Sequence, residues 1–249
     1  MNVQEHYQRL LAEEYDFVFG GFTENSANAA ALLGRLNLQP SLSGRALDLG
    51  CGPGYYAAPL AQAGYSVQAL DWEPTLLASL ADRCAGMDVV SVRADMREFV
   101  AHCKGPVELV LCMGDSLAHL TSSAEVSALL RQAAEVLEPG GRLLLSFRDQ
   151  SRALIGADRF LTLRSDAQRI FSCFIEFAEE SLEVTDILHV RQGQEWAVRK
   201  SAYRKTRLTG GQVEAMCRAA GLEVELRVNE AGLITLLACK FAQSGESVS

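Results

Sequence analysis

The chain has 249 residues and a formal net charge of -8 at pH 7, and 49% of its residues are hydrophobic, 22% charged and 7% aromatic. This composition is typical of a globular protein with one well-filled core. Because nucleic-acid binding depends on neutralising phosphates, the negative charge disfavours DNA and RNA as partners. The nearest approach to a basic run, RKSAYRKTR at 199–207, alternates as the solvated side of a strand does.

The cysteines and the N-terminus point to a reducing compartment. The seven cysteines are an odd number, without a C-x-x-C pair or a histidine at zinc spacing, so we expect small buried side chains and no metal site. The first 16 residues are too acidic and polar for a signal peptide, and no apolar run approaches the ~18 residues of a membrane helix. The sequence therefore predicts a cytoplasmic protein that does not use a membrane.

Apolar runs alternate with helical segments over the first 150 residues. A helix is predicted over 25–38, and five strands follow at 45–50, 65–71, 88–95, 107–114 and 141–147. The helices between them are expected at about 55–63, after Pro74, near 97–102 and at about 123–137, and EPGG at 138–141 is expected as a turn. Strands separated by helices form βαβ units, which predicts a parallel sheet covered on both faces.

The pattern changes after residue 148. Segments such as RIFSCFIEF and SLEVTDILHV, within about 160–206, indicate an antiparallel meander, and a helix at 209–221 and two strands at 222–228 and 233–241 close the chain. The predicted fold class is α/β, a Rossmann-like, doubly wound, mostly parallel seven-stranded sheet with an antiparallel β insertion after the fifth strand. Its expected parts are a binding core with N-terminal helices at 1–150, the insertion at 151–206, the closing elements at 207–243 and a tail at 244–249.

Three glycines follow the first strand at alternate positions, in LDLGCGPG. Gly50, Gly52 and Gly54 come where ligands bind in open parallel sheets, and glycine permits positive φ and a close approach of the ligand to the backbone. A tight turn without a ligand is the alternative. Asp71 ends the second strand 21 positions after Gly50, near the ~20-residue offset of an acid that binds ribose, and Asp95 ends the third, where a carboxylate could accept from an adenine amino group. Together these residues predict an adenosine-type cofactor.

The loop disfavours a dinucleotide. The G-x-G-x-x-G pattern needs a glycine at position 55, where this chain has Tyr55, and Pro53 lacks an N–H that a diphosphate would use. A ligand with ribose and adenine but no phosphate fits better than NAD or FAD, and S-adenosylmethionine is such a ligand.

The segments LDLGCGPG, ALDWEP, RADM and LEPGGRLLLS together resemble the class I S-adenosylmethionine-dependent methyltransferases, over nearly the whole chain from Tyr15 onward. The resemblance implies that the glycine loop faces the methionine part of the cofactor, that Asp71 grips the ribose and Trp72 lies along the adenine, and that S-adenosylhomocysteine is the product. The cofactor-binding residues expected from it are Tyr15, Asp48, Gly50, Cys51, Gly52, Gly54, Asp71, Trp72, Asp95, Met96, Met113, Gly114 and His119.

The segment after the fourth strand, CMGDSLAHL, lacks the Pro-Pro motif of enzymes that methylate bases or protein glutamine. With SFRD it is similar to the glycine and sarcosine N-methyltransferase group, in which the arginine that matches Arg148 holds a carboxylate. Asp115 and Asp149 stand where that group has asparagine, which disfavours glycine itself as acceptor. Expected acceptor-side residues are Asp115, Ser116, Arg148 and Tyr203, with Arg204 beside Tyr203.

No residue is assigned to catalysis, and three candidates remain. Asp115 is expected either to orient an amine or hydroxyl of the acceptor or to cap the next helix. His119 is expected either to accept a proton from the acceptor or to make a structural hydrogen bond. Tyr15 closes over the cofactor, or packs under the N-terminal helix. Arg148 either holds the acceptor or pairs with Asp149 or Asp115. The other histidines, His6, His102 and His189, are not expected to form a functional cluster (a constellation) with other residues.

The sequence thus predicts methyl transfer from S-adenosylmethionine to a small-molecule acceptor with an amino, carboxylate or hydroxyl group, with N-methylation favoured. A protein or peptide methyltransferase and a catalytically silent cofactor-binding regulatory protein are the alternatives. The insertion is expected either as a lid over the acceptor site or as a contact within a homodimer.

Overall fold

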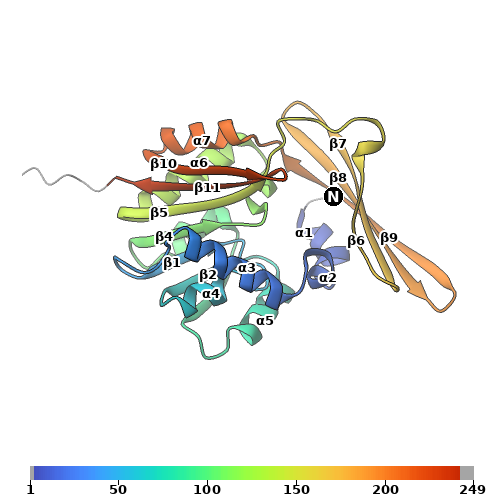
Figure 1. Ribbon diagram of the computed structural model, residues 1–249, viewed down its shortest axis with the longest axis horizontal. Helices are drawn as coiled ribbons and strands as arrows, with labels where there is room; N and C mark the ends of the chain where they lie inside the picture. The colour runs from blue at the N-terminus through green and yellow to red at the C-terminus, as the bar shows by residue number, and fades with distance from the viewer. Residues whose placement is uncertain (1–2, 242–249) are drawn as a thin grey trace, which may run out of the picture.

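The structure, a computed structural model, describes residues 3–241, so the expected tail at 244–249 lies outside the described residues (Figure 1). Its main sheet has seven strands in the order β10-β11-β5-β4-β1-β2-β3. Strands β1 to β5 run parallel, and β11 and β10 are added antiparallel at the edge. The predicted sheet is confirmed. The strands are β1 (Arg45–Leu49), β2 (Ser66–Asp71), β3 (Val89–Arg93), β4 (Val107–Cys112), β5 (Leu137–Arg148), β10 (Leu222–Glu230) and β11 (Leu233–Lys240).

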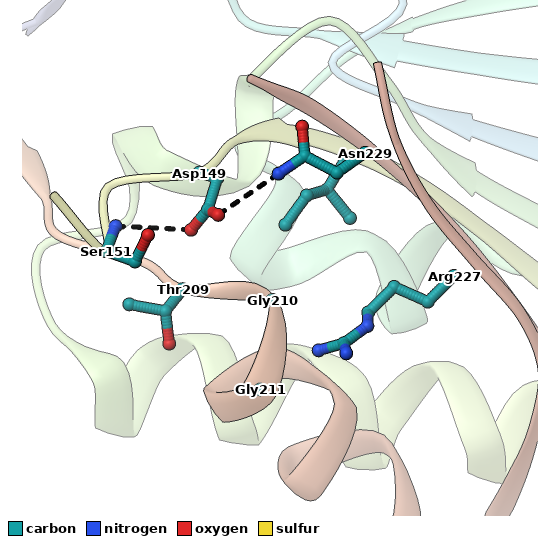
Figure 2. A pocket seen from close by; sticks show the side chains of 8 residues that line it. Asp149, Ser151, Thr209, Gly210, Gly211, Arg227 and Asn229 are labelled. Atoms are coloured by element: carbon teal, nitrogen blue, oxygen red, sulfur yellow. Dashed lines mark hydrogen bonds between the residues drawn. The ribbon is translucent and has the colours of Figure 1, made fainter. Parts of the chain in front are cut away.

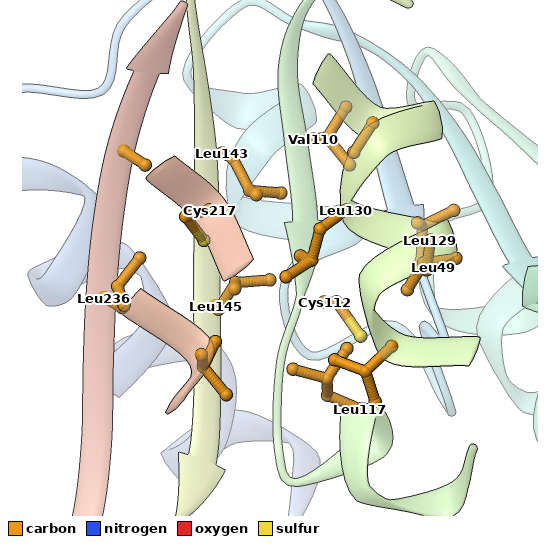
Figure 3. Close-up of a cluster of buried hydrophobic side chains, with 14 of the residues drawn as sticks. Leu49, Val110, Cys112, Leu117, Leu129, Leu130, Leu143, Leu145, Cys217 and Leu236 are labelled. Atoms are coloured by element: carbon orange, nitrogen blue, oxygen red, sulfur yellow. The ribbon is translucent and has the colours of Figure 1, made fainter. Parts of the chain in front are cut away.

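Alternate strand residues point to opposite faces of this sheet. Both faces carry buried apolar side chains, and helices cover both. On β4, Val110 and Cys112 join the cluster under α6 (Ser123–Val136) and α7 (Gly210–Ala219), part of which Figure 3 shows. Leu109 and Leu111 join the opposite cluster. That cluster lies under α3 (Phe22–Arg35), α4 (Ala57–Gln62) and α5 (Pro74–Arg83). Two short 3₁₀ helices, η2 (Met96–His102) and η3 (Ser116–His119), follow β3 and β4, and a third, η4 (Gly156–Arg159), precedes the insertion strands.

The predicted antiparallel insertion is confirmed and forms a separate sheet of its own. Its order is β6-β7-β8-β9, and every neighbouring pair is antiparallel. The strands are β6 (Phe160–Ser165), β7 (Arg169–Phe177), β8 (Ser181–Gln192) and β9 (Glu195–Thr206). Figure 1 shows this sheet beyond the ends of the main sheet's strands.

The N-terminal segment lies between the two sheets (Figure 1). It comprises α1 (Val3–His6), the π-helix η1 (Tyr7–Leu11) and α2 (Tyr15–Phe19). Leu10 and Leu11 pack with Phe171 and Leu188 of the second sheet in one buried cluster. The segment is therefore held mainly by the insertion.

Three local features extend or correct the sequence predictions. Strand β5 begins at Leu137, which pairs with Val107, so the EPGG segment expected as a turn belongs to the strand. The seven cysteines are free; five are buried and Cys103 and Cys239 are half-buried. Among residues 3–241, no helix combines the length and the apolar character needed to cross a membrane.

Candidate functional site

The glycine loop after β1 has a backbone that favours glycine at each alternate position. Gly50, Gly52 and Gly54 have φ of +70°, +52° and +91°. A Cβ on Gly50 would lie 2.8 Å from Ser116 Oγ, and one on Gly52 would lie 3.3 Å from the Tyr15 hydroxyl. The loop thus brings β1, η3 and α2 together at the carboxyl end of the sheet.

The N–H groups of this loop are used within the chain. Gly50 and Cys51 donate to the Leu70 carbonyl at 2.8 and 3.0 Å, Gly52 donates to Asp71 Oδ2 at 2.9 Å, and Gly54 donates to the Cys51 carbonyl at 3.1 Å. Pro53 has no N–H. A diphosphate needs free donors of this kind, so the loop fits a phosphate-free ligand and disfavours a dinucleotide.

Asp71 closes the loop from the end of β2. Its second oxygen, Oδ1, accepts from the N–H of Glu73 at 2.9 Å. Burial raises the pKa of Asp71, although the N–H groups of Glu73 and Gly52 oppose the rise. A carboxylate offers about four lone-pair sites, and the N–H groups of Gly52, Glu73 and Trp72 act on this one, so capacity remains for a hydroxyl donor. The half-buried Trp72 follows directly, next to the Tyr7 ring at 5.2 Å.

Asp48 lies on β1, behind the loop. It is buried, its Oδ2 has no hydrogen-bond partner among the described residues, and burial together with the charge of Asp71 raises its pKa to about 7. A buried carboxyl oxygen without a partner beside this loop is compatible with a ligand that donates hydrogen bonds or carries positive charge.

Asp95 follows β3 and caps η2. Its Oδ1 accepts from the Arg97 N–H at 2.9 Å, and its Oδ2 pairs with the Arg97 guanidinium at 2.7 Å, which lowers the pKa of Asp95. Met96 is buried, and a Cβ on Gly50 would lie 3.5 Å from its Cε. The structure therefore gives Asp95 a partner that the sequence prediction omitted.

Aromatic rings fill the space between the two sheets. We call the rings of His6, Tyr7, Tyr15, Trp72, His119 and Tyr203 the aromatic layer. Tyr7 is central: its ring centroid lies 5.9 Å from that of His119 and 6.4 Å from that of Tyr15. Tyr203 of β9 stacks on His6 at 4.1 Å and lies 5.7 Å from His119. The N-terminal helices, η3 and β9, which are distant in the chain, thus meet near the glycine loop.

Asp115 adopts a left-handed backbone, with φ of +76°, in the loop between β4 and η3. Its Oδ1 accepts from the Arg148 N–H at 2.9 Å, and its Oδ2 accepts from Lys205 Nζ at 2.6 Å. Asp115 precedes η3 but makes no side-chain cap, so the capping alternative is wrong. In the described part of the chain the Arg148 guanidinium makes no ion pair with Asp115 or Asp149, so that alternative is wrong too.

Asp149 faces a different hollow, shown in Figure 2. Its carboxylate accepts from the Ser151 N–H and from Asn229 Nδ2, both at 3.2 Å. The hollow, of about 450 Å³, lies beside the start of α7 and shares no lining residue with the glycine loop. Asp149 therefore belongs to the β10–β11 edge and not to the acceptor side.

Ser116 is bound to the loop. Its hydroxyl donates to the Met113 carbonyl at 2.9 Å, and the Gly114 N–H donates to Ser146 Oγ at 2.7 Å. Met113 is buried and Gly114 is exposed. These contacts connect β4 to β5 and leave Ser116 beside Gly50.

His119 ends η3. Its Nδ1 is buried without a hydrogen-bond partner among the described residues, so the expected structural hydrogen bond is not made through this atom. Burial lowers the pKa of His119 well below its ordinary value, and the charges of Lys205 and His6 lower it further. His119 is thus a neutral imidazole at pH 7.

Sequence reasoning missed three of the residues that gather here. His6 lies with its Nε2 3.0 Å from Asp186 Oδ2 and is fully buried, so the prediction that it has no constellation is wrong. Lys205 lies two residues after Tyr203 and shares its face of β9, which strand periodicity could have revealed. Arg204, between them, is exposed on the opposite face and does not line this site. For Tyr7, no signal in the sequence indicated that a π-helix would place it here.

Comparisons with known proteins agree with this geometry. Residues 46–141 match a family described as a methyltransferase domain. A ubiquinone biosynthesis O-methyltransferase of Xanthomonas axonopodis pv. citri (strain 306) is 30% identical over 57% of this chain and 60% of its own length. A cypemycin N-terminal methyltransferase of a Streptomyces species is 28% identical over 88% of this chain and 87% of its own.

Among solved structures, CalS10, an amino pentose methyltransferase from Micromonospora echinaspora solved with SAM bound, superposes with a TM-score of 0.73 at 20% identity. The match covers 92% of this chain and 95% of that one. The chain spans about 60% of the length of the ubiquinone biosynthesis relative. The fold similarity thus covers nearly the whole chain, whereas that alignment covers little more than half of it.

Proposed function

We propose that this chain, which has the class I S-adenosylmethionine-dependent methyltransferase fold and carries a methyltransferase domain at residues 46–141, transfers a methyl group to a small-molecule acceptor. One observation carries the proposal. The loop at Gly50, Gly52 and Gly54 has its N–H groups satisfied internally and is closed by Asp71, an arrangement that suits an adenosyl ligand without phosphate.

The residues around the loop fit S-adenosylmethionine. Asp71 has lone pairs for ribose hydroxyls, Trp72 offers a ring face to adenine, and the aromatic layer offers ring faces to a positive sulfonium. When bound, this cofactor supplies a methyl group that is already activated for displacement. The proposed binding set also contains Tyr15, Asp48, Gly50, Cys51, Gly52, Gly54, Asp95, Met96, Met113, Gly114 and His119.

The acceptor side supplies positioning and a dry environment, which carry much of the catalysis in such a displacement. The Arg148 guanidinium is exposed and is suited to an acceptor carboxylate. Tyr203 and the rest of the aromatic layer exclude water, and the neutral His119 is suited to take a proton from an amine. These features support N-methylation over methylation of a carboxylate, which has no proton to lose at pH 7.

The test combines binding and turnover. Calorimetry with S-adenosylhomocysteine is expected to show one site per chain, and incubation with labelled S-adenosylmethionine and a metabolite extract is expected to yield small labelled products. Binding of NAD or FAD in place of the adenosyl ligand would overturn the proposal.

A second candidate is methylation of a peptide amine. It is favoured by the cypemycin N-terminal methyltransferase, whose alignment covers 88% of this chain. Labelled protein or peptide in the same incubation would support it. Tight cofactor binding without any labelled product would instead support a catalytically silent regulatory protein.

The proposal extends to the setting of the enzyme. Seven free cysteines support a reducing, cytoplasmic compartment, and the charge of -8 supports a partner other than nucleic acid or an anionic membrane surface. Residues 151–206 act as the cover of the acceptor site, and their exposed Phe160, Trp196 and Val198 support a homodimer contact. Light scattering of the purified chain tests the dimer.

A further inference from the structure

An ion pair joins the two sheets at the acceptor side. Lys205 comes from β9 and Asp115 from the loop after β4, and their side chains are 14% and 13% exposed, with Nζ and Oδ2 2.6 Å apart. The other oxygen of Asp115 accepts from the Arg148 N–H. Both carboxylate oxygens are thus held by the protein itself, and Lys205 neutralises their charge.

The backbone fixes the direction of this carboxylate. The backbone of Asp115 is in the left-handed conformation, and its N–H donates to the Ser146 carbonyl at 3.2 Å. A pair this shielded from water interacts more strongly than a surface pair, and loss of one partner leaves an uncompensated charge. The charge of Lys205 therefore affects the protonation of titratable side chains nearby.

His119 is the titratable group that this charge reaches. Facing it are Tyr7 of η1, Tyr203 and Lys205 of β9 and His6 of α1, and Asp115 precedes the same short helix. Lys205 Nζ lies 5.6 Å from the centroid of the Tyr203 ring, which in turn lies 5.7 Å from that of His119. The ammonium group opposes a second positive charge on the imidazole, and Nδ1 has no partner to stabilise one.

We propose that Lys205 is a positioning residue that sets the charge of the acceptor corner, which we define as Asp115, His119, Tyr203 and Lys205. Its ammonium cancels the charge of Asp115 and keeps His119 uncharged, so that the corner receives the acceptor nitrogen as an uncharged amine and not as an ammonium ion. This inference rests on the proposed methyltransferase function and narrows its substrate class.

The chemistry balances with the residues present. The amine nitrogen forms the new bond to the methyl carbon with its lone pair, and the electron pair of the broken carbon–sulfur bond stays on sulfur. The proton released by the nitrogen passes through the neutral ring of His119 to solvent, because the ammonium of Lys205 keeps the ring from holding it. A His119 that was already protonated could not take this proton.

The experiment follows the histidine ring signals of the full chain by NMR as a function of pH, with His119 assigned from a His119→Gln variant. In the wild type, His119 is expected to titrate well below about pH 6.5. In Lys205→Met its midpoint is expected to rise by about half a pH unit or more, because a nearby positive charge is gone. Lys205→Arg is expected to restore the wild-type midpoint, and Lys200→Met, on the exposed face of the same strand, to leave it unchanged.

Asp115→Asn separates charge from structure. It breaks the same ion pair but leaves the ammonium, so the midpoint is expected to stay low or fall, opposite to Lys205→Met. Equal shifts in the same direction in both variants, or an ordinary midpoint in the wild type, would overturn the inference, and the wild-type measurement decides even where a variant does not fold. Calorimetry with S-adenosylhomocysteine on the same samples tests the proposed function separately.

Discussion

The carboxylate of Asp71, at the end of β2, accepts a hydrogen bond of 2.9 Å from the N–H of Gly52, in the loop after β1. One side chain therefore holds the glycine loop, and in the proposed function the same carboxylate accepts a hydrogen bond from a ribose hydroxyl. Asp71→Ala is expected to weaken S-adenosylhomocysteine binding at least about tenfold, because hydrogen bonds to charged groups contribute ~1.5 to 3 kcal/mol each.

Calorimetry measures this loss of affinity. Asp82→Ala is the matched control, because Asp82 is exposed on α5 and is expected to change the affinity by less than about twofold. An Asp71→Ala protein that binds as tightly as the wild type would contradict the ribose role.

The glycine loop makes a second prediction. In Gly50→Ala the new Cβ meets Ser116 Oγ at 2.8 Å on a backbone with φ of +70°. We expect the free energy of unfolding to fall by ~1 to 3 kcal/mol, from the left-handed backbone and the displaced Ser116. Urea denaturation measures it. Gly34→Ala, inside α3 with no atom within 4 Å of the new Cβ, is expected to raise stability by ~0.5 to 1 kcal/mol.

Much of the main sheet could be predicted from the sequence because its signals are local. The runs at RALDLG and VELVLCMG are mostly apolar and buried on both faces, as parallel strands are, and glycines mark their ends. The glycine loop and Asp71 share one short segment of chain and one sheet edge, so their proximity follows from the strand pattern.

The acceptor corner could not be predicted in the same way. Lys205 and Asp115 are 90 positions apart, and their contact depends on how the second sheet packs against the first, which periodicity does not encode. Tyr7 reaches the aromatic layer through a π-helix, in which the Ala12 N–H donates to the Tyr7 carbonyl, five residues earlier in the chain. Strand β5 starts early because Val107 pairs across a bulge, against the turn preference of EPGG.

Asp48 makes the stability of the protein depend on pH. Its folded-state pKa of about 7 lies above the value near 4 of an unfolded aspartate, so the folded state binds the extra proton between these pH values. The free energy of unfolding is therefore expected to fall as pH rises from about 4 to 7, by a few kcal/mol from this group, and to level off above 7. Asp48→Asn is expected to remove most of this fall, as measured by urea denaturation at pH 5 and pH 8.

Asp48→Asn keeps the size of the side chain, so a purely structural effect would be the same at both pH values. The comparison between pH 5 and pH 8 is therefore the control. The variant is expected to gain stability relative to the wild type at pH 8 and to differ little at pH 5. An equal change at both pH values would show that Asp48 does not hold a proton in the folded protein.

Tyr55, the residue after Gly54, anchors α2 of the N-terminal segment beside the glycine loop. Its hydroxyl lies 2.9 Å from Asp16 Oδ1 and 2.9 Å from the Gly20 carbonyl, at both ends of α2, and Asp16 also pairs with Arg83. Tyr55→Phe removes the hydroxyl donor and leaves the ring in place. Because Tyr15 lies on α2, above Gly52, a looser α2 is expected to uncover the cofactor side of the site.

We expect faster hydrogen–deuterium exchange in residues 15–21 of Tyr55→Phe, with unchanged exchange in β1 and β4, and a loss of ~0.5 to 1.5 kcal/mol of stability. S-adenosylhomocysteine is expected to restore slow exchange, since a ligand beneath Tyr15 stabilises the closed form. Tyr65→Phe is the control: Tyr65 is buried, but its hydroxyl makes no hydrogen bond with the described residues. If ligand slowed exchange in β1 but left residues 15–21 as fast as before, Tyr15 would not cover the cofactor, and the N-terminal segment would serve packing alone.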